Sequence, residues 1–303
     1  MKVFKVKKIK VSTGEEIAYL KEGSGNKILL IHGNMSSSVF YYKTIEELSK
    51  YFEVYALDLR GFGDSSYNNK INSFYELSLD VEAFINEMEL KDLNIVGWSA
   101  GGGVALELMA NPKVKSKIKA VILLSSIGIR GINPINYTEY NLWNLNRSYF
   151  KGLNNVLHEN MVFALDNMNG LYTKLFSFDT FEGRKNSLEK LYRQFVYNVK
   201  EVDEEEFNRN IEAALKQRNL KEIGQAIKNF DIVSNGKIKE IKTPILMLHG
   251  LKDLIVKPYI IEKSAKELGD NTSLKIFKNA GHSLMTDIFE EYIEEIINFF
   301  NKN

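Results

Sequence analysis

Cysteine is absent from this chain of 303 residues, and its absence excludes several kinds of chemistry. Disulfide bridges, thiol nucleophiles and thiolate metal sites all require it, and a chain without it is compatible with a reducing compartment. Histidine is also scarce, with four residues in the chain. Because no pair of histidines stands near carboxylates at the spacing of metal ligands, we expect no metal site.

The chain also lacks a strong charge of either sign and any long apolar run. Its 40 Lys and Arg against 39 Asp and Glu give a formal net charge of +1, which favours neither nucleic acid nor an acidic membrane as a partner. The longest apolar runs, around 28–31 and 120–124, are too short to span a bilayer, and the N-terminal segment is interrupted by lysines, unlike a signal peptide. We expect a cytoplasmic protein, and the sequence leaves its homo-oligomeric state open.

What the chain does contain is an alternation of strand and helix patterns. Two alternating segments around Ser12-Thr13-Gly14 predict a β-hairpin over 3–20. Short apolar runs, typical of strands buried on both faces, start at residues 27, 53, 93 and 119, and further strands are indicated from residues 243 and 273. Helical spacing follows most of them, over 39–52 after the first. Ser73 with Glu76 predicts a capping box for a helix that ends near residue 90. The alternation predicts an α/β fold with a mostly parallel, doubly wound sheet.

The alternation stops in the middle of the chain. Between residues 130 and 231 no buried strand is indicated, and leucines and aromatics recur at helical spacing. We therefore expect a helical cap at 130–231 inserted into a core made of 1–129 and 232–303. The aromatic residues of this segment either line an apolar pocket or pack among its helices. They include Tyr137, Tyr140, Trp143, Phe150, Phe163 and Tyr172.

The segment Gly97-Trp98-Ser99-Ala100-Gly101 stands between an apolar run and a helical pattern. This arrangement is typical of a nucleophile elbow, a sharp strand-to-helix turn that exposes a serine. Glycine is needed two residues before and after the serine because a side chain there would collide with the flanking strand or helix. The run Gly101-Gly102-Gly103 aligns with neither a dinucleotide fingerprint nor a lysine-bearing phosphate loop, so we expect no cofactor.

Two residues in later loops have the chemistry that activates Ser99. In open α/β sheets the loops at the carboxyl ends of the strands gather together. Ser99, Asp253 and His282 each follow a predicted strand. A histidine can take the serine proton and an aspartate can orient the imidazole, and the order serine, acid, histidine is that of α/β-hydrolases. We therefore predict a catalytic triad.

The other histidines and acids are weaker candidates. His32 and His249 each precede a loop glycine, and His158 lies in the predicted cap, which leaves His282 as the base. For His32 we favour a role in ordering its loop over contact with substrate. Asp231 and Asp287 are the alternative acids, and for both a capping or solvated role is the better interpretation.

The tetrahedral oxyanion of acyl transfer needs two hydrogen-bond donors. The first is expected to be the amide of Ala100, at the start of the elbow helix, where N–H groups have no partner within the helix. The second is expected to be the amide of Asn34, in the loop after the first buried strand. The alternative for Asn34 is an ordinary turn residue.

A charged segment, Asp58-Leu59-Arg60-Gly61-Phe62-Gly63-Asp64-Ser65, follows the second predicted buried strand. Its carboxylates and arginine could take part in acid-base chemistry. The glycines and the close spacing favour instead a loop held by ion pairs and by side-chain to backbone hydrogen bonds.

These motifs together resemble the α/β-hydrolase superfamily. The resemblance rests on His32-Gly33-Asn34, the Asp58–Ser65 segment, the elbow around Ser99, the Asp253 loop and Gly281-His282, and it covers the two core segments, about two thirds of the chain. Within the superfamily the chain is most similar to bacterial cytoplasmic ester hydrolases, including intracellular short-chain polyhydroxyalkanoate depolymerases. The resemblance implies a small-molecule ester or a short-chain polyester as substrate. Relatives that cleave haloalkanes or epoxides have aspartate in place of the serine.

Our main functional hypothesis is a serine hydrolase that cleaves a carboxylic ester through an acyl-enzyme. Two alternatives stay open at this point. The same triad could hydrolyse a carbon–carbon bond or a lactone, or catalyse a cofactor-free lyase step. The fold could also serve as a ligand receptor without turnover.

Overall fold

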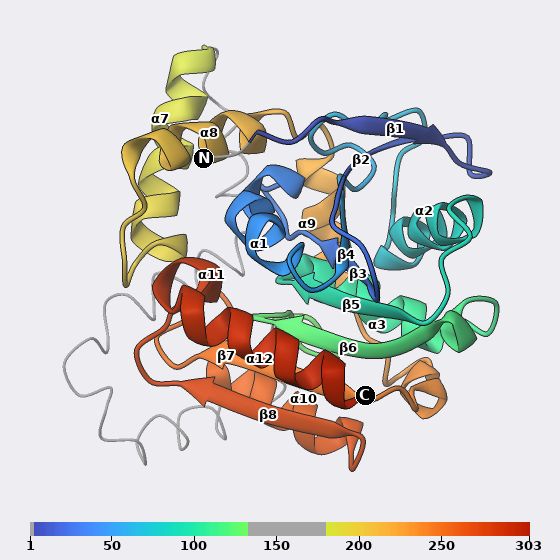
Figure 1. The fold of residues 1–303 in the computed structure, drawn as a ribbon. Coiled ribbons are helices and arrows are strands. Elements are labelled where there is room, and N and C mark those ends of the chain that lie inside the picture. Colours follow the sequence, from blue (N-terminus) through green and yellow to red (C-terminus); the bar gives the residue numbers. More distant parts are fainter. Residues whose placement is uncertain (1–2, 133–179) are drawn as a thin grey trace.

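An eight-stranded sheet runs through residues 3–132 and 180–303, the part of the chain that the computed structural model describes (Figure 1). The strands lie in the order β1-β2-β4-β3-β5-β6-β7-β8. β1 and β2 are antiparallel to their neighbours, and all pairs from β4 to β8 are parallel. The strands are β1 (Lys7–Lys10), β2 (Glu16–Glu22), β3 (Lys27–Ile31), β4 (Glu53–Leu57), β5 (Leu93–Trp98), β6 (Ile118–Leu124), β7 (Ile245–Gly250) and β8 (Thr272–Phe277).

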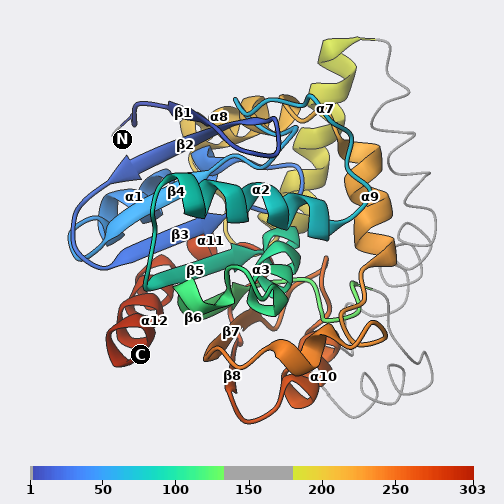
Figure 2. The same ribbon diagram turned by 90° about the vertical axis from the view of Figure 1, so that its right-hand side faces the viewer.

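Helices cover both faces of the sheet. One face packs against α2, α3 and α10 and the other against α1 and α12, as Figures 1 and 2 show from two sides. Along β3, Leu29 and Ile31 join the first apolar cluster while Ile28 and Leu30 join the second. The core helices are α1 (Tyr42–Leu48), α2 (Phe74–Glu87), α3 (Ala100–Ala110), α10 (Pro258–Leu268), α11 (Leu284–Asp287) and α12 (Phe289–Lys302). The predicted hairpin, the six strands and the doubly wound sheet are confirmed. β8 lies at the edge of the sheet, and of its residues only Phe277 is buried.

Local details of two helix starts differ from prediction. Ser73 makes no side-chain hydrogen bond at the start of α2, and the Glu76 carboxylate accepts the amide of Asn72. The capping box predicted for Ser73 and Glu76 is therefore wrong, because the carboxylate reaches one residue further back. The helix predicted from residue 39 begins only at Tyr42, after a 3₁₀ turn.

Helices also fill the described part of the predicted insertion, between β6 and β7. They are α7 (Phe181–Leu191), α8 (Glu204–Leu215) and α9 (Leu220–Asn229), with a π-helical turn at Tyr192–Val196. Buried residues of α7 and α8 belong to the apolar cluster on the α1 and α12 face, and those of α9 belong to the other cluster. The aromatic residues Tyr137 to Tyr172 and His158, named above for the cap, lie outside the described residues.

Candidate active site

Ser99 stands at a sharp turn between β5 and α3. Its backbone has φ 53° and ψ −120°, a conformation that L-residues rarely adopt. A Cβ on Gly97 would lie 2.7 Å from the carbonyl oxygen of Gly101, and one on Gly101 would lie 2.3 Å from the carbonyl oxygen of Ile31. Both distances are far below van der Waals contact. The elbow geometry therefore requires glycine at both positions, as the sequence predicts.

Asp253 and His282, from the loops after β7 and β8, lie in direct contact. His282 Nδ1 is 2.8 Å from Asp253 Oδ2, and both side chains are buried. A carboxylate only accepts, so Nδ1–H donates and Nε2 is left as the basic nitrogen. Trp98 Nε1 donates to the His282 carbonyl at 3.1 Å, which ties the histidine loop to the residue before Ser99. The structure thus gathers all three predicted residues at the same edge of the sheet.

The Asp253 carboxylate is surrounded by donors. Oδ1 accepts the amides of Ile255 and Val256 at 2.8 and 2.9 Å, while Oδ2 faces His282 and, at 3.5 Å, His249 Nε2. Burial raises the pKa of Asp253, but the neighbouring histidines and the hydrogen bonds outweigh burial and hold the pKa below its usual value. Asp253 is therefore ionised at neutral pH, as a residue that orients an imidazole must be.

The loop after β3 lies against the elbow. A Cβ on Gly33 would be 2.8 Å from the Cβ of Ser99, so the backbone of this loop touches the serine. His32 orders the loop as predicted: its Nδ1–H donates to the Gly33 carbonyl at 2.8 Å, and its Nε2 accepts the Leu59 amide at 3.0 Å. Of the two expected oxyanion donors, Asn34 follows Gly33 in this loop and Ala100 is the first residue of α3.

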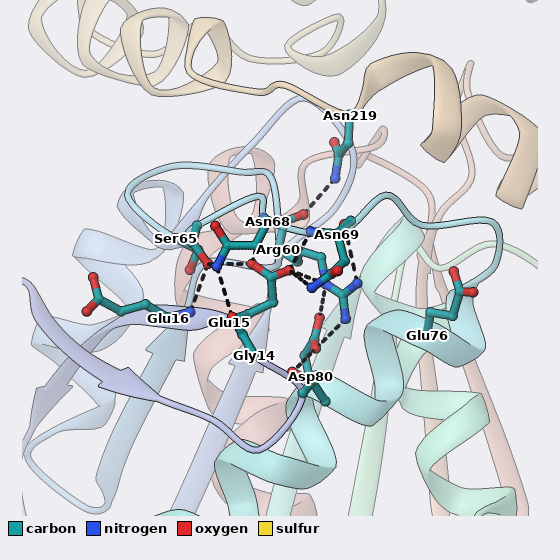
Figure 3. Close-up of polar contacts among 12 residues, drawn as sticks. Gly14, Glu15, Glu16, Arg60, Ser65, Asn68, Asn69, Glu76, Asp80 and Asn219 are labelled. Carbon is teal, nitrogen blue, oxygen red and sulfur yellow. Dashed lines mark hydrogen bonds and ion pairs between the residues drawn. The ribbon is translucent and has the colours of Figure 1, made fainter.

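The charged loop after β4 is held together as predicted. Asp58 accepts the amides of Ser38 and Asp64 at 2.8 and 2.9 Å. The partners of Arg60 were not predicted: its guanidinium forms a two-pronged contact with Asp80 and lies 3.6 Å from Glu15, all three being buried (Figure 3). These contacts give the loop a structural role.

Asp287 has a role in the site that the sequence does not indicate. It ends the short helix α11, and its carboxylate accepts the amide of Gly281 at 2.7 Å and that of Lys200 at 3.1 Å. The predicted capping or solvated role is therefore wrong. Asp287 braces the backbone next to His282 and joins it to the segment after the π-helical turn. Asp231, the other alternative acid, binds the amides of Val233 and Ser234 in its own turn.

Asp287 also makes stability depend on pH. Burial raises its pKa from 3.8 to about 6, although the two amide donors oppose the shift. The folded protein therefore binds this proton more readily than the unfolded chain, and the stability that Asp287 contributes is complete below pH 4 and lost as the pH rises through 6. Asparagine at this position does not titrate. We therefore expect the free energy of unfolding of Asp287→Asn to rise by roughly 1 to 2 kcal/mol relative to that of wild type as the pH goes from 4 to 7, allowing for partial solvent exposure.

Urea unfolding of both proteins at pH 4, 5.5 and 7 measures this difference. Asp231→Asn is the matched control. Burial raises the pKa of Asp231, but its hydrogen bonds with Ser234 and Val233 outweigh burial and lower the pKa overall. The free energy of unfolding of Asp231→Asn should therefore differ from that of wild type by a nearly constant amount above pH 4. An Asp287→Asn difference that is also flat over this range contradicts the expectation.

Several further residues, from the segment that the sequence assigns to the cap, bind the loops of the site. Tyr192 and Gln217 bind the loop after β3. Asn198 donates to the Lys252 carbonyl, and Asn219 to a carbonyl of the charged loop. No motif marks these residues, because their role depends on how the insertion docks.

Among residues 3–132 and 180–303, no cluster of three or more His, Asp or Glu residues could hold a metal ion. Within the same ranges, no helix has the length and apolar character needed to cross a membrane.

The family model described as the alpha/beta hydrolase fold matches residues 26–287. The chain is similar to AB hydrolase superfamily protein YisY of Bacillus subtilis, with 24% identity over 294 residues, covering 96% of this chain and 98% of that protein. It is 26% identical over 288 residues to the pimeloyl-[acyl-carrier protein] methyl ester esterase of Wigglesworthia glossinidia brevipalpis. The alignment covers 92% of this chain and 96% of that protein. The solved esterase structure from Exiguobacterium antarcticum has the same fold, with a TM-score of 0.78 at 19% identity over 97% of this chain and 98% of that one.

Proposed function

Because the chain belongs to the α/β-hydrolase fold family, we propose that it is a carboxylic ester hydrolase that works through an acyl-enzyme on Ser99. In the first half of the reaction the Ser99 hydroxyl oxygen attacks the ester carbonyl carbon, and its proton passes to His282 Nε2. The carbonyl oxygen becomes an oxyanion, which accepts hydrogen bonds from the amides of Asn34 and Ala100.

The tetrahedral intermediate then collapses. The bond to the alcohol oxygen breaks, and the imidazolium of His282 protonates the departing alkoxide, which leaves as the alcohol. In the second half, water attacks the acyl-enzyme while His282 takes its proton. The acid is released as the proton returns to Ser99. Throughout, Asp253 keeps Nδ1 protonated and stabilises the positive imidazolium.

The contact between Asp253 and His282 is the observation that carries this proposal. Its 2.8 Å distance sets the histidine tautomer that a general base needs, and the Trp98 indole holds that histidine beside the elbow. A serine nucleophile forms an ester intermediate, which fits acyl transfer to water. The similar protein named as a methyl ester esterase supports the same substrate class.

We also propose the extent of the two parts of the chain and the kind of substrate. Residues 1–129 and 232–303 form the catalytic core, and 130–231 form the cap; α7, α8 and α9, which are inserted between β6 and β7, support this division. The substrate is a small-molecule ester or a short-chain polyester.

A fluorophosphonate probe with a panel of model substrates tests the reaction class. We expect one probe molecule per folded chain, bound on the peptide that contains Ser99, and a parallel loss of turnover of short-chain p-nitrophenyl esters. Probe attachment requires the same activated serine as ester hydrolysis. Mass spectrometry of the digested protein locates the label.

The panel also contains lactones and vinylogous diketones. A large preference for the diketones reassigns the enzyme to carbon–carbon bond hydrolysis. Folded protein that neither takes up the probe nor turns over any substrate points to a ligand receptor instead.

A further inference from the structure

Met35, in the loop after β3, has a backbone that needs outside support. Its φ of 53° lies in the left-handed region, which costs on the order of 1 kcal/mol for a residue with a side chain. Both of its backbone polar groups are bound by side chains from the inserted helical segment. The Met35 amide donates to Gln217 Oε1 at 2.9 Å, and its carbonyl accepts the Tyr192 hydroxyl.

Gln217 binds two consecutive residues of this loop. While its Oε1 accepts the Met35 amide, its Nε2 donates to Asn34 Oδ1 at 2.9 Å and to Asn219 Oδ1 at 3.0 Å. The donor from Met35 fixes which end of the Gln217 amide is the oxygen. Gln217 therefore contacts both Asn34, whose amide is the proposed oxyanion donor of this loop, and the residue that follows it.

Gln217 is itself held in place by its neighbours. Residues 216–219, which we call the strap, join α8 to α9 and lie on the charged loop after β4. The Arg218 amide donates to the Gly61 carbonyl at 2.8 Å. Asn219 Nδ2 donates to the Arg60 carbonyl at 2.6 Å, a contact that Figure 3 shows above the ion pairs of Arg60. The strap therefore links a loop stiffened by buried charges to the loop that touches Ser99.

We propose that Gln217 is a positioning residue for the oxyanion hole. By holding the Met35 amide and the Asn34 side chain together, it keeps the loop in the left-handed turn that presents the Asn34 amide beside Ser99. This role rests on the proposed ester hydrolysis. The distance between a donor and the developing oxyanion governs how much the donor stabilises the transition state, so a loose loop lowers kcat more than it changes KM.

Replacement of Gln217 is expected to leave the fold intact. A pocket on the cap side is lined by Met35, Leu188, Leu215, Gln217 and others, so water can reach the Met35 amide once the side chain is shortened. A solvated amide avoids the cost of a buried donor without a partner. The variants can therefore be compared as folded enzymes.

The test compares three variants with wild type on a short-chain p-nitrophenyl ester. We expect Gln217→Ala to lower kcat by about 10- to 100-fold with KM within about two-fold, a smaller loss than deletion of an oxyanion donor. Gln217→Glu keeps an acceptor for the Met35 amide and is expected to restore part of kcat. Lys216→Met is the matched control on the same strap, because Lys216 forms an exposed ion pair with Asp64 and does not contact the oxyanion loop. It is expected to match wild type.

Inhibition by a trifluoromethyl ketone distinguishes a positioning role of Gln217 from a purely structural one. Its adduct with the serine carries an oxyanion, so its Ki for Gln217→Ala should rise by the same factor by which kcat falls. Hydrogen exchange of the peptide that covers residues 33–38 should become faster in Gln217→Ala, while the remaining core peptides stay unchanged.

Equal kcat for Gln217→Ala and Lys216→Met overturns the proposal. So does a fall in kcat that comes with faster exchange across the whole core and an unchanged Ki, because that pattern is general destabilisation. If wild type hydrolyses no ester, the proposed function fails, and with it the oxyanion role. The exchange of residues 33–38 then still decides whether Gln217 holds the loop.

Discussion

Ser99→Ala is expected to lower kcat/KM for short-chain p-nitrophenyl esters by about 10⁴-fold or more. The hydroxyl is the only group that can form the acyl-enzyme in the proposed mechanism, and removal of such a nucleophile costs several orders of magnitude even when the binding site is intact. Alanine has the same Cβ as serine and meets the same backbone constraint at φ 53°, so the elbow should keep its shape. Steady-state kinetics with purified protein measures the loss.

Ser264→Ala is the matched control for this variant. Ser264 is a buried serine of α10 whose hydroxyl donates to the Ile260 carbonyl at 2.7 Å and accepts the Ile129 amide at 3.2 Å. Its loss is expected to cost about 1 to 3 kcal/mol of stability, because the Ile129 amide loses its partner, and to leave kcat/KM within about two-fold. Turnover by Ser99→Ala at the level of the control assigns the chemistry to another residue.

Asp253→Asn is expected to lower kcat by about 10³- to 10⁴-fold. An asparagine amide can turn its NH₂ toward His282 Nδ1 and hold the wrong tautomer, and it carries no charge to stabilise the imidazolium. The backbone donors of Ile255 and Val256 can still find an oxygen on the new side chain, so the loop should stay ordered. A pre-steady-state measurement separates slow acylation from slow release of the acid.

Asp231→Asn serves as the control for the acid. Asp231 accepts the amides of Val233 and Ser234 in its own turn and is expected to be dispensable for turnover. Loss of kcat in Asp231→Asn but not in Asp253→Asn would reverse the assignment of the acid.

The buried strands are predictable because their signal is local and strong. The apolar runs that become β3 and β5 pack on both faces of the sheet, and their lengths of five and six residues are typical of a strand and short for a buried helix. Helix starts are less predictable, since they depend on one hydrogen bond. Glu76 can reach either of two neighbouring amides, and the sequence does not reveal that it binds Asn72.

The candidate site likewise has a part that the sequence predicts and a part that it does not. Ser99, Asp253 and His282 follow strands whose carboxyl ends meet, so their proximity follows from the topology. Gln217 and Tyr192 have no such link to Met35. Their contacts depend on how the helices of the insertion dock, and neither residue stands in a motif that indicates docking.

The long interval between β6 and β7 has a consequence for how the protein folds. Roughly 120 residues separate two strands that pair directly, and closing a loop of that size is a late and slow event in folding. Ser99 lies before the interval, and Asp253 and His282 lie after it. A chain leaving the ribosome thus contains the Ser99 turn long before His282 has been synthesised. The serine stays unactivated until the last two strands join the sheet.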